Sequence, residues 1–331
     1  MAAINFSKLI PWKHLVSFLA GMALLIYLIY SLGAGEIGAQ LSSIGWTYLS
    51  VFVISFFYLF LQTLAWHVTI TEGHVSFWGL FRIKISMEAL NAFLPFSLIK
   101  GESIGAQQLR DRFGILSGSI PIITDRSIRT LALFLFISIG FIVGFLNLTT
   151  LHPLLRLGIP ALTVLKLLIC GILIKKSTSG FYTVLLSKCP QFSPCASPAS
   201  LGQHYEMDLA LKAIYENKRG NFYQALLLHL LSYGLLVVEI YLIGSTILPE
   251  FNPAMALTLT AIIPFITMIF YFLPGSFGVR EGILVGLIGL IVGAPAALAG
   301  VTIELVRRAR TLFWVIIGFG LTGNPFKMFL K

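Results

Sequence analysis

The chain has 331 residues, of which 57% are hydrophobic and only 11% are charged, and its mean hydropathy is +0.91. Soluble domains contain roughly a quarter charged residues, so this composition excludes a soluble globular protein. It predicts an all-α polytopic membrane protein, because helices satisfy their own backbone hydrogen bonds in lipid. Despite a net charge of +10, we expect no nucleic-acid partner.

A transmembrane helix needs about 20 predominantly apolar residues. Apolar runs predict spans near 14–34, 46–70, 127–147, 157–174, 223–248, 254–273 and 311–323. Two interrupted apolar pieces lie at 78–99 and 282–299, which gives about 7–9 transmembrane or re-entrant segments. The first run is too long for a removable signal peptide and lacks a small-residue cleavage site.

Two twelve-residue stretches, 93–104 (FLPFSLIKGESI) and 272–283 (FLPGSFGVREGI), align without a gap. The same register continues through four further matches, Gly114 with Gly293, Asp125 with Glu304, Arg129 with Arg308 and Leu133-Phe134 with Leu312-Phe313. Internal duplication is typical of transporter folds, whose interrupted helices build a site at the repeat interface. The predicted organisation is a first transmembrane helix and linker at 1–45, repeat 1 at 46–148, a connecting helix and polar basic loop at 149–222, and repeat 2 at 223–331.

Basic residues predict the orientation, because short cytoplasmic loops are rich in Lys and Arg. Lys8 and Lys13 precede the first span, whereas the loop 35–45 contains no basic residue. The N-terminus is therefore expected to be cytoplasmic, as is the basic stretch 175–219. Span 46–70 then enters the membrane from the outside, whereas its counterpart in the second repeat, span 223–248, enters from the cytoplasm. The two repeats are therefore expected to be inverted. The second part of the polar stretch is either an amphipathic surface helix or a solvated connector.

Cysteine and histidine give no sign of a metal or disulfide site. The chain has three cysteines without CxxC or paired spacing, and its six histidines are scattered without an HxxxH pair. These spacings predict neither a metal nor another cofactor. A phosphate-binding GxxxxGK[ST] pattern is also missing from the sequence, which argues against ATP hydrolysis by this chain.

Arginine is concentrated in the two repeats. Of eleven arginines, eight lie in the two aligned stretches 93–134 and 272–313, whereas of twelve lysines only Lys100 does: the eight are Arg110, Arg112, Arg126, Arg129, Arg280, Arg307, Arg308 and Arg310. The planar guanidinium binds phosphate or carboxylate through two parallel hydrogen bonds and stays charged in a dry setting. This distribution predicts buried ion pairs or binding of anionic headgroups.

Asp125 with Arg129, and Glu304 with Arg308, are each spaced i, i+4 and so share one helix face. An unpaired charge at the centre of a bilayer costs about 2.5–3.5 kcal/mol on the insertion scale. One interpretation is that acid and arginine neutralise each other and lock the helices together. The other is that excess arginine faces a polar cavity between the halves, with the acids orienting the guanidinium groups. Glu239 is a further acid within a span, either a proton carrier or a structural counter-ion.

Prolines and glycines interrupt both repeats at matching places. Proline ends or kinks a helix, which membranes tolerate only inside protein or beside water, and glycine permits sharp turns and close approach. We therefore assign a structural role to six residues of the repeated motif, namely Asn91, Pro95, Gly101, Pro274, Gly275 and Gly278.

The segments Asn91-x-x-x-Pro95, Gly101-Glu102, Asp125-Arg126 and above all 274–281 (PGSFGVRE) resemble the flippase-like transmembrane domain family. Its best-known member is the transmembrane region of lysylphosphatidylglycerol synthetase/flippase, and the resemblance covers essentially the whole chain. It implies a bacterial or archaeal cytoplasmic-membrane protein that moves a polar lipid between leaflets. We expect no aminoacyl transfer, because a synthase domain is missing from this sequence.

The resulting hypothesis is a lipid transporter rather than an enzyme. The expected headgroup contacts are Arg126, Arg129, Arg280, Arg307 and Arg308. The residues expected to pair with them or carry protons are Glu102, Asp125, Glu239, Glu281 and Glu304. Expected partners are phospholipid, hopanoid or polyprenyl-linked lipids, together with enzymes of lipid synthesis. The alternatives are a membrane-embedded transferase acting on a lipid headgroup or lipid-linked sugar, and an accessory subunit of a lipid-synthesis complex.

Overall fold

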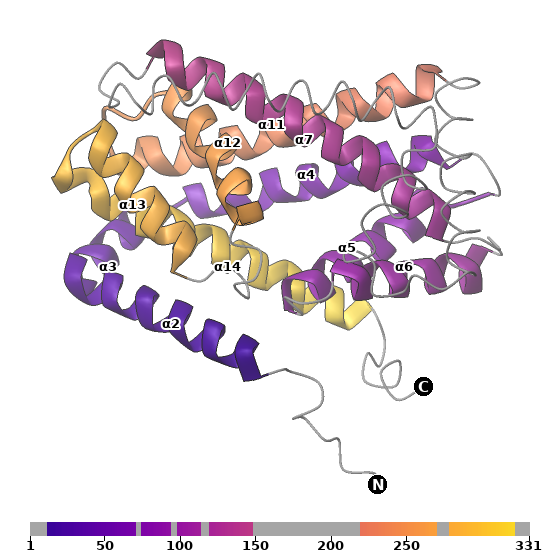
Figure 1. Ribbon diagram of the computed structural model, residues 1–331, viewed down its shortest axis with the longest axis horizontal. Coiled ribbons are helices and arrows are strands. Elements are labelled where there is room, and N and C mark those ends of the chain that lie inside the picture. The colour runs from indigo at the N-terminus through magenta and orange to yellow at the C-terminus, as the bar shows by residue number, and fades with distance from the viewer. Residues whose placement is uncertain are drawn as a thin grey trace, which may run out of the picture.

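The computed structural model describes residues 12–70, 74–93, 98–113, 119–147, 219–269 and 278–321. Within these ranges all regular secondary structure is helical (Figure 1). Three of the described helices are long and apolar enough to cross a membrane, namely α4 (Thr47–Thr69), α7 (Ser119–Asn147) and α11 (Arg219–Ile247). A bent pair of helices near the N-terminus adds a fourth span if its two parts are counted together. The protein is therefore a membrane protein with several apolar spans, as its composition predicted.

The first predicted span and its linker are two helices rather than one. α2 (Trp12–Leu32) is followed at once by α3 (Ala34–Ser43), and the two meet at 87°. Gly33 lies between them with a φ of +91°, a left-handed conformation that glycine adopts without steric cost. The linker part of 1–45 thus contains a helix, which the low hydropathy of its sequence did not predict.

The long central spans were predicted well, and their ends differ for physical reasons. α4 and α11 match the predicted spans 46–70 and 223–248 closely. α7 begins earlier than the predicted 127, because its first turns contain the charged Asp125 and Arg126 and were not counted as apolar. The predicted span 157–174 lies outside the described residues.

Separate helices lie on either side of both copies of the aligned motif, whose residues 94–97 and 270–277 lie outside the described residues. In the first, α5 (Phe77–Phe93) and α6 (Leu98–Phe113) are separate helices that pack on each other. In the second, α12 (Pro253–Ile269), α13 (Val279–Ile291), the 3₁₀ turn η3 (Ala294–Ala297) and α14 (Leu298–Leu321) follow in order. α13 ends before Gly293, whose φ is +126°. The predicted span 311–323 is only the second half of α14, whose first half carries four charged residues.

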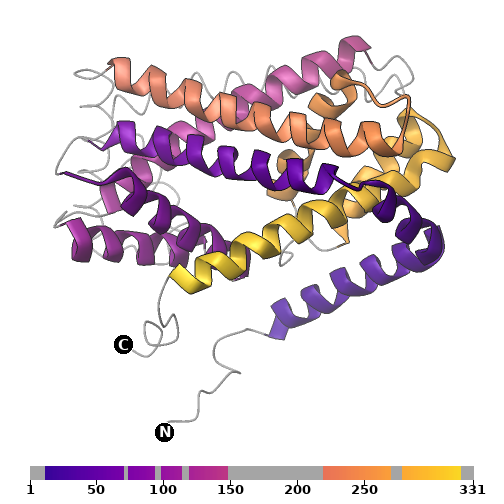
Figure 2. The ribbon, with the colours of Figure 1, turned by 180° about the vertical axis from the view of Figure 1, so that it is seen from behind.

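Figure 2 shows α4 and α11 lying side by side along the molecule, where they form a central contact. They run antiparallel, since Thr47 lies 3.4 Å from Thr246 (Oγ1 to Oγ1) and the amide of Asn221 donates to the carbonyl of Val68. Around this pair α5 packs against α14, and α12 packs against α7. Glycine allows both outer contacts, because a Cβ at Gly318 or at Gly140 would overlap the facing helix.

The buried apolar side chains form a core at each end of the molecule. The larger core joins α11, α12, α13 and α14 around Ile243, Leu259 and Ile303. The second joins α4, α5 and α6 around Trp66 and Leu109. Many large apolar side chains remain exposed on the outer helix faces, Leu19, Tyr27 and Leu146 among them. Such surfaces are expected of a protein whose surroundings are lipid chains.

Candidate functional site

Seven ionisable side chains from three helices gather beside the larger apolar core. We call them the C-terminal cluster: Glu239 of α11, Arg280 and Glu281 of α13, and Glu304, Arg307, Arg308 and Arg310 of α14. Glu304, Arg307 and Arg308 share one face of α14, since residues three and four apart are neighbours on a helix. α13 reaches this face because α14 carries Gly300 against it, where a Cβ would lie 2.6 Å from the carbonyl carbon of Leu284.

The three carboxylates of this cluster are buried, and each has a guanidinium partner. Glu239 accepts from Arg310, and its Oε1 lies 3.5 Å from Nε of Arg307. Glu304 accepts from Arg307, and Glu281 accepts from Arg308. All three acids are at most 1% exposed. Buried carboxylates of this kind persist only when they are paired and hydrogen-bonded, so the ion pairs hold α11, α13 and α14 together.

Arg280 differs from the other arginines of the cluster. Within the described part of the chain it has no ion pair or direct hydrogen bond, and its Nε is buried without a partner. It lies within electrostatic range of Glu304 and Glu281. The cluster holds four arginines against three glutamates, so one positive charge remains when every group is ionised.

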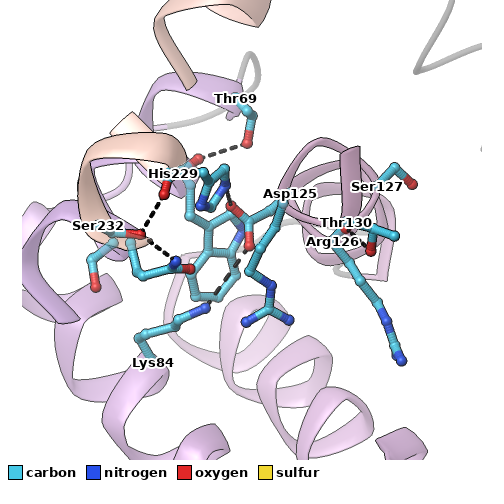
Figure 3. A network of polar contacts seen from close by, with 12 residues as sticks. Thr69, Lys84, Asp125, Arg126, Ser127, Thr130, His229 and Ser232 are labelled. Atoms are coloured by element: carbon cyan, nitrogen blue, oxygen red, sulfur yellow. Dashed lines mark hydrogen bonds and ion pairs between the residues drawn. The ribbon is translucent and has the colours of Figure 1, made fainter. Parts of the chain in front are cut away.

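A second group lies where α5, α7 and α11 meet. We call it the N-terminal cluster: Lys84 and Glu88 of α5, Asp125 and Arg129 of α7, and His229 of α11. Asp125 is the centre of the network that Figure 3 shows, with its Oδ1 3.1 Å from Nε2 of His229 and its Oδ2 3.9 Å from Nζ of Lys84. Glu88 links Lys84 at 3.5 Å to Arg129 at 3.3 Å. With His229 neutral, two cations face two carboxylates.

A hydrogen bond from α4 reaches α11 beside the backbone of His229. The amide of Gln62 donates to the hydroxyl of Ser232 at 2.7 Å, and that hydroxyl donates to the carbonyl of His229 at 2.7 Å (Figure 3). Nδ1 of His229 is buried and has no hydrogen-bond partner among the described residues. Among the described residues, the polar contact that holds the ring is therefore the one between its Nε2 and Asp125.

The partners of the acids revise the interpretation of the i, i+4 spacing. Asp125 pairs across helices with Lys84 and His229, while Arg129 pairs with Glu88. In the C-terminal half Arg308 pairs with Glu281 on α13, and Glu304 pairs with Arg307. Most of these ion pairs thus join different helices. Asp125 and Arg129 belong to one cluster, as do Glu304 and Arg308, but the closest partner of each is another residue.

Several predicted residues fall apart from the clusters. Arg126 extends away from Asp125 and Lys84 in Figure 3, on the far side of α7. Glu102 belongs to α6, but its side chain lies outside the described residues, as do Pro95, Pro274 and Gly275. Three residues of the predicted structural motif are described and make close contacts, namely Asn91, Gly101 and Gly278.

These contacts explain the motif. A Cβ at Gly101 would lie 2.9 Å from the carbonyl oxygen of Met87 and would overlap the side chain of Asn91, so α6 approaches α5 only with glycine there. Gly278 precedes α13 with a φ of +72°, and a Cβ there would lie 2.6 Å from the carbonyl oxygen of Gly21 on α2. Both glycines therefore allow a close approach between helices.

Sequence reasoning missed four members of the clusters as site residues, namely Lys84, Glu88, His229 and Arg310. Lys84 and Glu88 are spaced i, i+4, and that spacing inside an apolar stretch was the available signal. No local pattern marks His229, because its partner Asp125 is 104 residues away. Arg310 contacts Glu239 across 71 residues.

Comparison with known proteins gives one family. The model of the family described as the lysylphosphatidylglycerol synthase TM region matches residues 14–318. No curated protein and no solved structure gives a significant match to the chain.

Proposed function

The chain belongs to the family of the lysylphosphatidylglycerol synthase TM region, and on that premise we propose that it moves an anionic polar lipid between the leaflets of a membrane. The lipid is a phospholipid, a hopanoid or a polyprenyl-linked lipid, and it leaves chemically unchanged. The membrane is the cytoplasmic membrane of a bacterium or an archaeon, as the sequence resemblance implies. The chain functions as a transporter, alone or beside enzymes of lipid synthesis.

The packing of the helices supports a transporter built from two repeats. α5 and α7 of the first repeat correspond in sequence order to α12 and α14 of the second. α5 packs against α14, and α12 packs against α7, so the second helix of each repeat contacts the last helix of the other. A twofold axis through the α4–α11 contact generates such an exchange of partners.

The direction of the central helices supports inverted repeats. α4 and α11 begin the two repeats and run antiparallel, with Thr47 beside Thr246 and Gln62 beside Ser232. If both cross the membrane, corresponding helices cross it in opposite directions. Inverted repeats place the substrate site of many transporters near the middle of the bilayer.

The observation that carries the proposal is the excess guanidinium at Arg280. Arg280 is half-buried with its Nε buried, and an incompletely paired charge within a membrane protein is expensive and marks a substrate pathway by default. Guanidinium is also the group best suited to a phosphate, which it binds with two parallel hydrogen bonds. An anionic headgroup beside Arg280 would balance the extra charge of the C-terminal cluster and satisfy its buried Nε.

Tyr58 supports a path that involves both halves. This tyrosine of α4 is close enough to feel the charges of Glu88 and Arg129 in the N-terminal cluster and of Arg310 and Glu239 in the C-terminal cluster. Tyr58 therefore lies within electrostatic range of both clusters. A headgroup moving along this line is sheltered from hydrocarbon while its acyl chains stay in lipid.

We predict that Arg280→Gln slows leaflet exchange of an anionic lipid by about 10–100-fold, since hydrogen bonds to charged groups contribute about 1.5–3 kcal/mol. The assay uses liposomes containing the purified protein and a fluorescent phosphatidylglycerol, whose outer-leaflet fraction is quenched chemically. Arg82→Gln is the matched control, because Arg82 is exposed on α5 and belongs to neither cluster.

Three outcomes contradict the proposal or its assignment of Arg280. Equal rates in liposomes with and without protein rule out transport of this lipid class. A chemically altered lipid, detected by mass spectrometry while exchange is unchanged, favours the transferase. An unchanged rate in the Arg280 variant removes this arginine from the path.

A further inference from the structure

The five side chains of the N-terminal cluster form a line from the interior toward the surface. In order they are His229, Asp125, Lys84, Glu88 and Arg129, and successive members lie 3.1, 3.9, 3.5 and 3.3 Å apart. Figure 3 shows the first three as a connected group between helices. The line alternates groups that accept a proton with groups that donate one.

Burial changes along this line. The side chain of His229 is 0% exposed, those of Lys84 and Asp125 are 4% and 6% exposed, and that of Glu88 is 38% exposed. A carboxylate at the accessible end thus leads to an imidazole at the buried end. Imidazole is the side chain that changes charge most readily between pH 5 and 8.

The charge of this line is balanced only while His229 is neutral. Lys84 and Arg129 then offset Asp125 and Glu88, in contrast to the C-terminal cluster with its extra arginine. A proton on His229 would give the line one unbalanced positive charge. Burial disfavours an imidazolium here, Asp125 stabilises it, and the charges of Arg129 and Lys84 oppose it.

No other helix packed against α11 supplies a charge at this point within the described residues. α4 contributes the neutral amide of Gln62 through Ser232, and the phenol of Tyr233 is on α11 itself. α12 contains no acidic or basic residue. The acids and arginines of α14 contact α11 further along, at Glu239. Proton binding at His229 is therefore governed by the line itself.

We propose that His229 and Asp125 together form a proton-binding site, reached from Glu88, and that one proton moves with each anionic lipid. The coupling rests on the proposed function, and it identifies the pH gradient as the force that drives the transport. A proton on His229 and an anionic headgroup neutralise each other's charge, so each raises the affinity for the other, as linkage requires. Lipid transport by this chain then follows a pH gradient.

The first test uses liposomes with a pH difference of about one unit and a membrane potential held at zero with potassium and valinomycin. One proton per lipid shifts the equilibrium distribution of the anionic lipid between leaflets about tenfold. In His229→Gln, whose amide still donates to Asp125 but carries no proton at these pH values, the distribution stays even. His67→Gln is the control and keeps the tenfold shift, because His67 contacts the carbonyl of Val75 outside the cluster.

The second test does not require transport. Protein with ¹⁵N-labelled histidine is titrated by NMR from about pH 5 to 8, and the His229 signal is identified by its loss in His229→Gln. The imidazole is expected to change protonation state, with a midpoint that rises when phosphatidylglycerol is added. A ring that keeps one state throughout overturns the proton site, whatever the transport assay gives. If His229 titrates but the pH gradient does not shift the distribution of the lipid, the coupling is overturned. The proposed function then still stands.

Discussion

Replacing Glu239 by leucine is expected to lower the free energy of unfolding by about 3–5 kcal/mol, the usual cost of removing one partner of a buried ion pair. Glu239 is fully buried and is the common partner of Arg307 and Arg310. Without Glu239, the guanidinium groups of Arg307 and Arg310 face α11 with less negative charge to balance them. The loss is measured by reversible unfolding in bicelles, with Glu250→Leu as control, because Glu250 is an exposed acid beyond the end of the same helix.

A double variant separates charge from packing at this position. In Glu239→Leu/Arg310→Leu the remaining Arg307 keeps Glu304, so at least half of the lost stability is expected to return. Replacement of a whole buried pair by apolar residues is often neutral. If Glu239→Leu is as stable as Glu250→Leu, the ion pairs of the C-terminal cluster do not hold the helices together.

Asp125→Leu is expected to have an effect of similar size, about 3–5 kcal/mol. The substitution leaves Lys84 buried with only Glu88 as an acid partner and takes the acceptor from His229. Adding Lys84→Met is expected to restore much of the stability, because no uncompensated ammonium group remains. A coupling energy of about 0.5–3 kcal/mol between the two sites is the expected result of the double-mutant cycle.

Asp111→Leu is the control for this cycle, since Asp111 is an exposed acid on α6. Strict additivity of Asp125→Leu and Lys84→Met would show that the two side chains do not interact, and it would break the line between Glu88 and His229. Loss of folding in both single variants with recovery in the double variant gives the same support as a measured coupling.

Hydropathy predicted the long apolar helices α4 and α11, each of which has one exposed apolar face. α4 and α11 are long, nearly uncharged and flanked by polar residues, so their ends followed from composition. α14 was found only in its second half, because Glu304, Arg307, Arg308 and Arg310 make its first half polar. Those charges are buried by partners on α11 and α13, and a pattern confined to one helix cannot reveal such partners.

The aligned motif drew attention to four residues of the C-terminal cluster before their partners were known. Arg280, Glu281, Glu304 and Arg308 were all found from the alignment of the two halves. The N-terminal cluster was found less completely, since Lys84 and Glu88 precede the aligned stretch and His229 follows a different span. Matching residues of the two repeats therefore have different partners, with Arg308 on Glu281 and Arg129 on Glu88.

This difference in partners gives the two clusters different tasks in the proposed transport. The C-terminal cluster has more guanidinium than carboxylate and suits a permanent site for an anion. The N-terminal cluster is balanced and becomes cationic only with an added proton. Transport driven in this way needs no nucleotide, in keeping with the lack of a phosphate-binding loop in the sequence.

The most direct test of the account compares two fluorescent lipids with the same acyl chains in the same protein-containing liposomes, one anionic and one zwitterionic. The site at Arg280 predicts that the anionic lipid exchanges at least about tenfold faster, from one charge-assisted hydrogen bond, and that Arg280→Gln removes the difference. Equal rates for both lipids in the wild-type protein would contradict an anion site between the two halves.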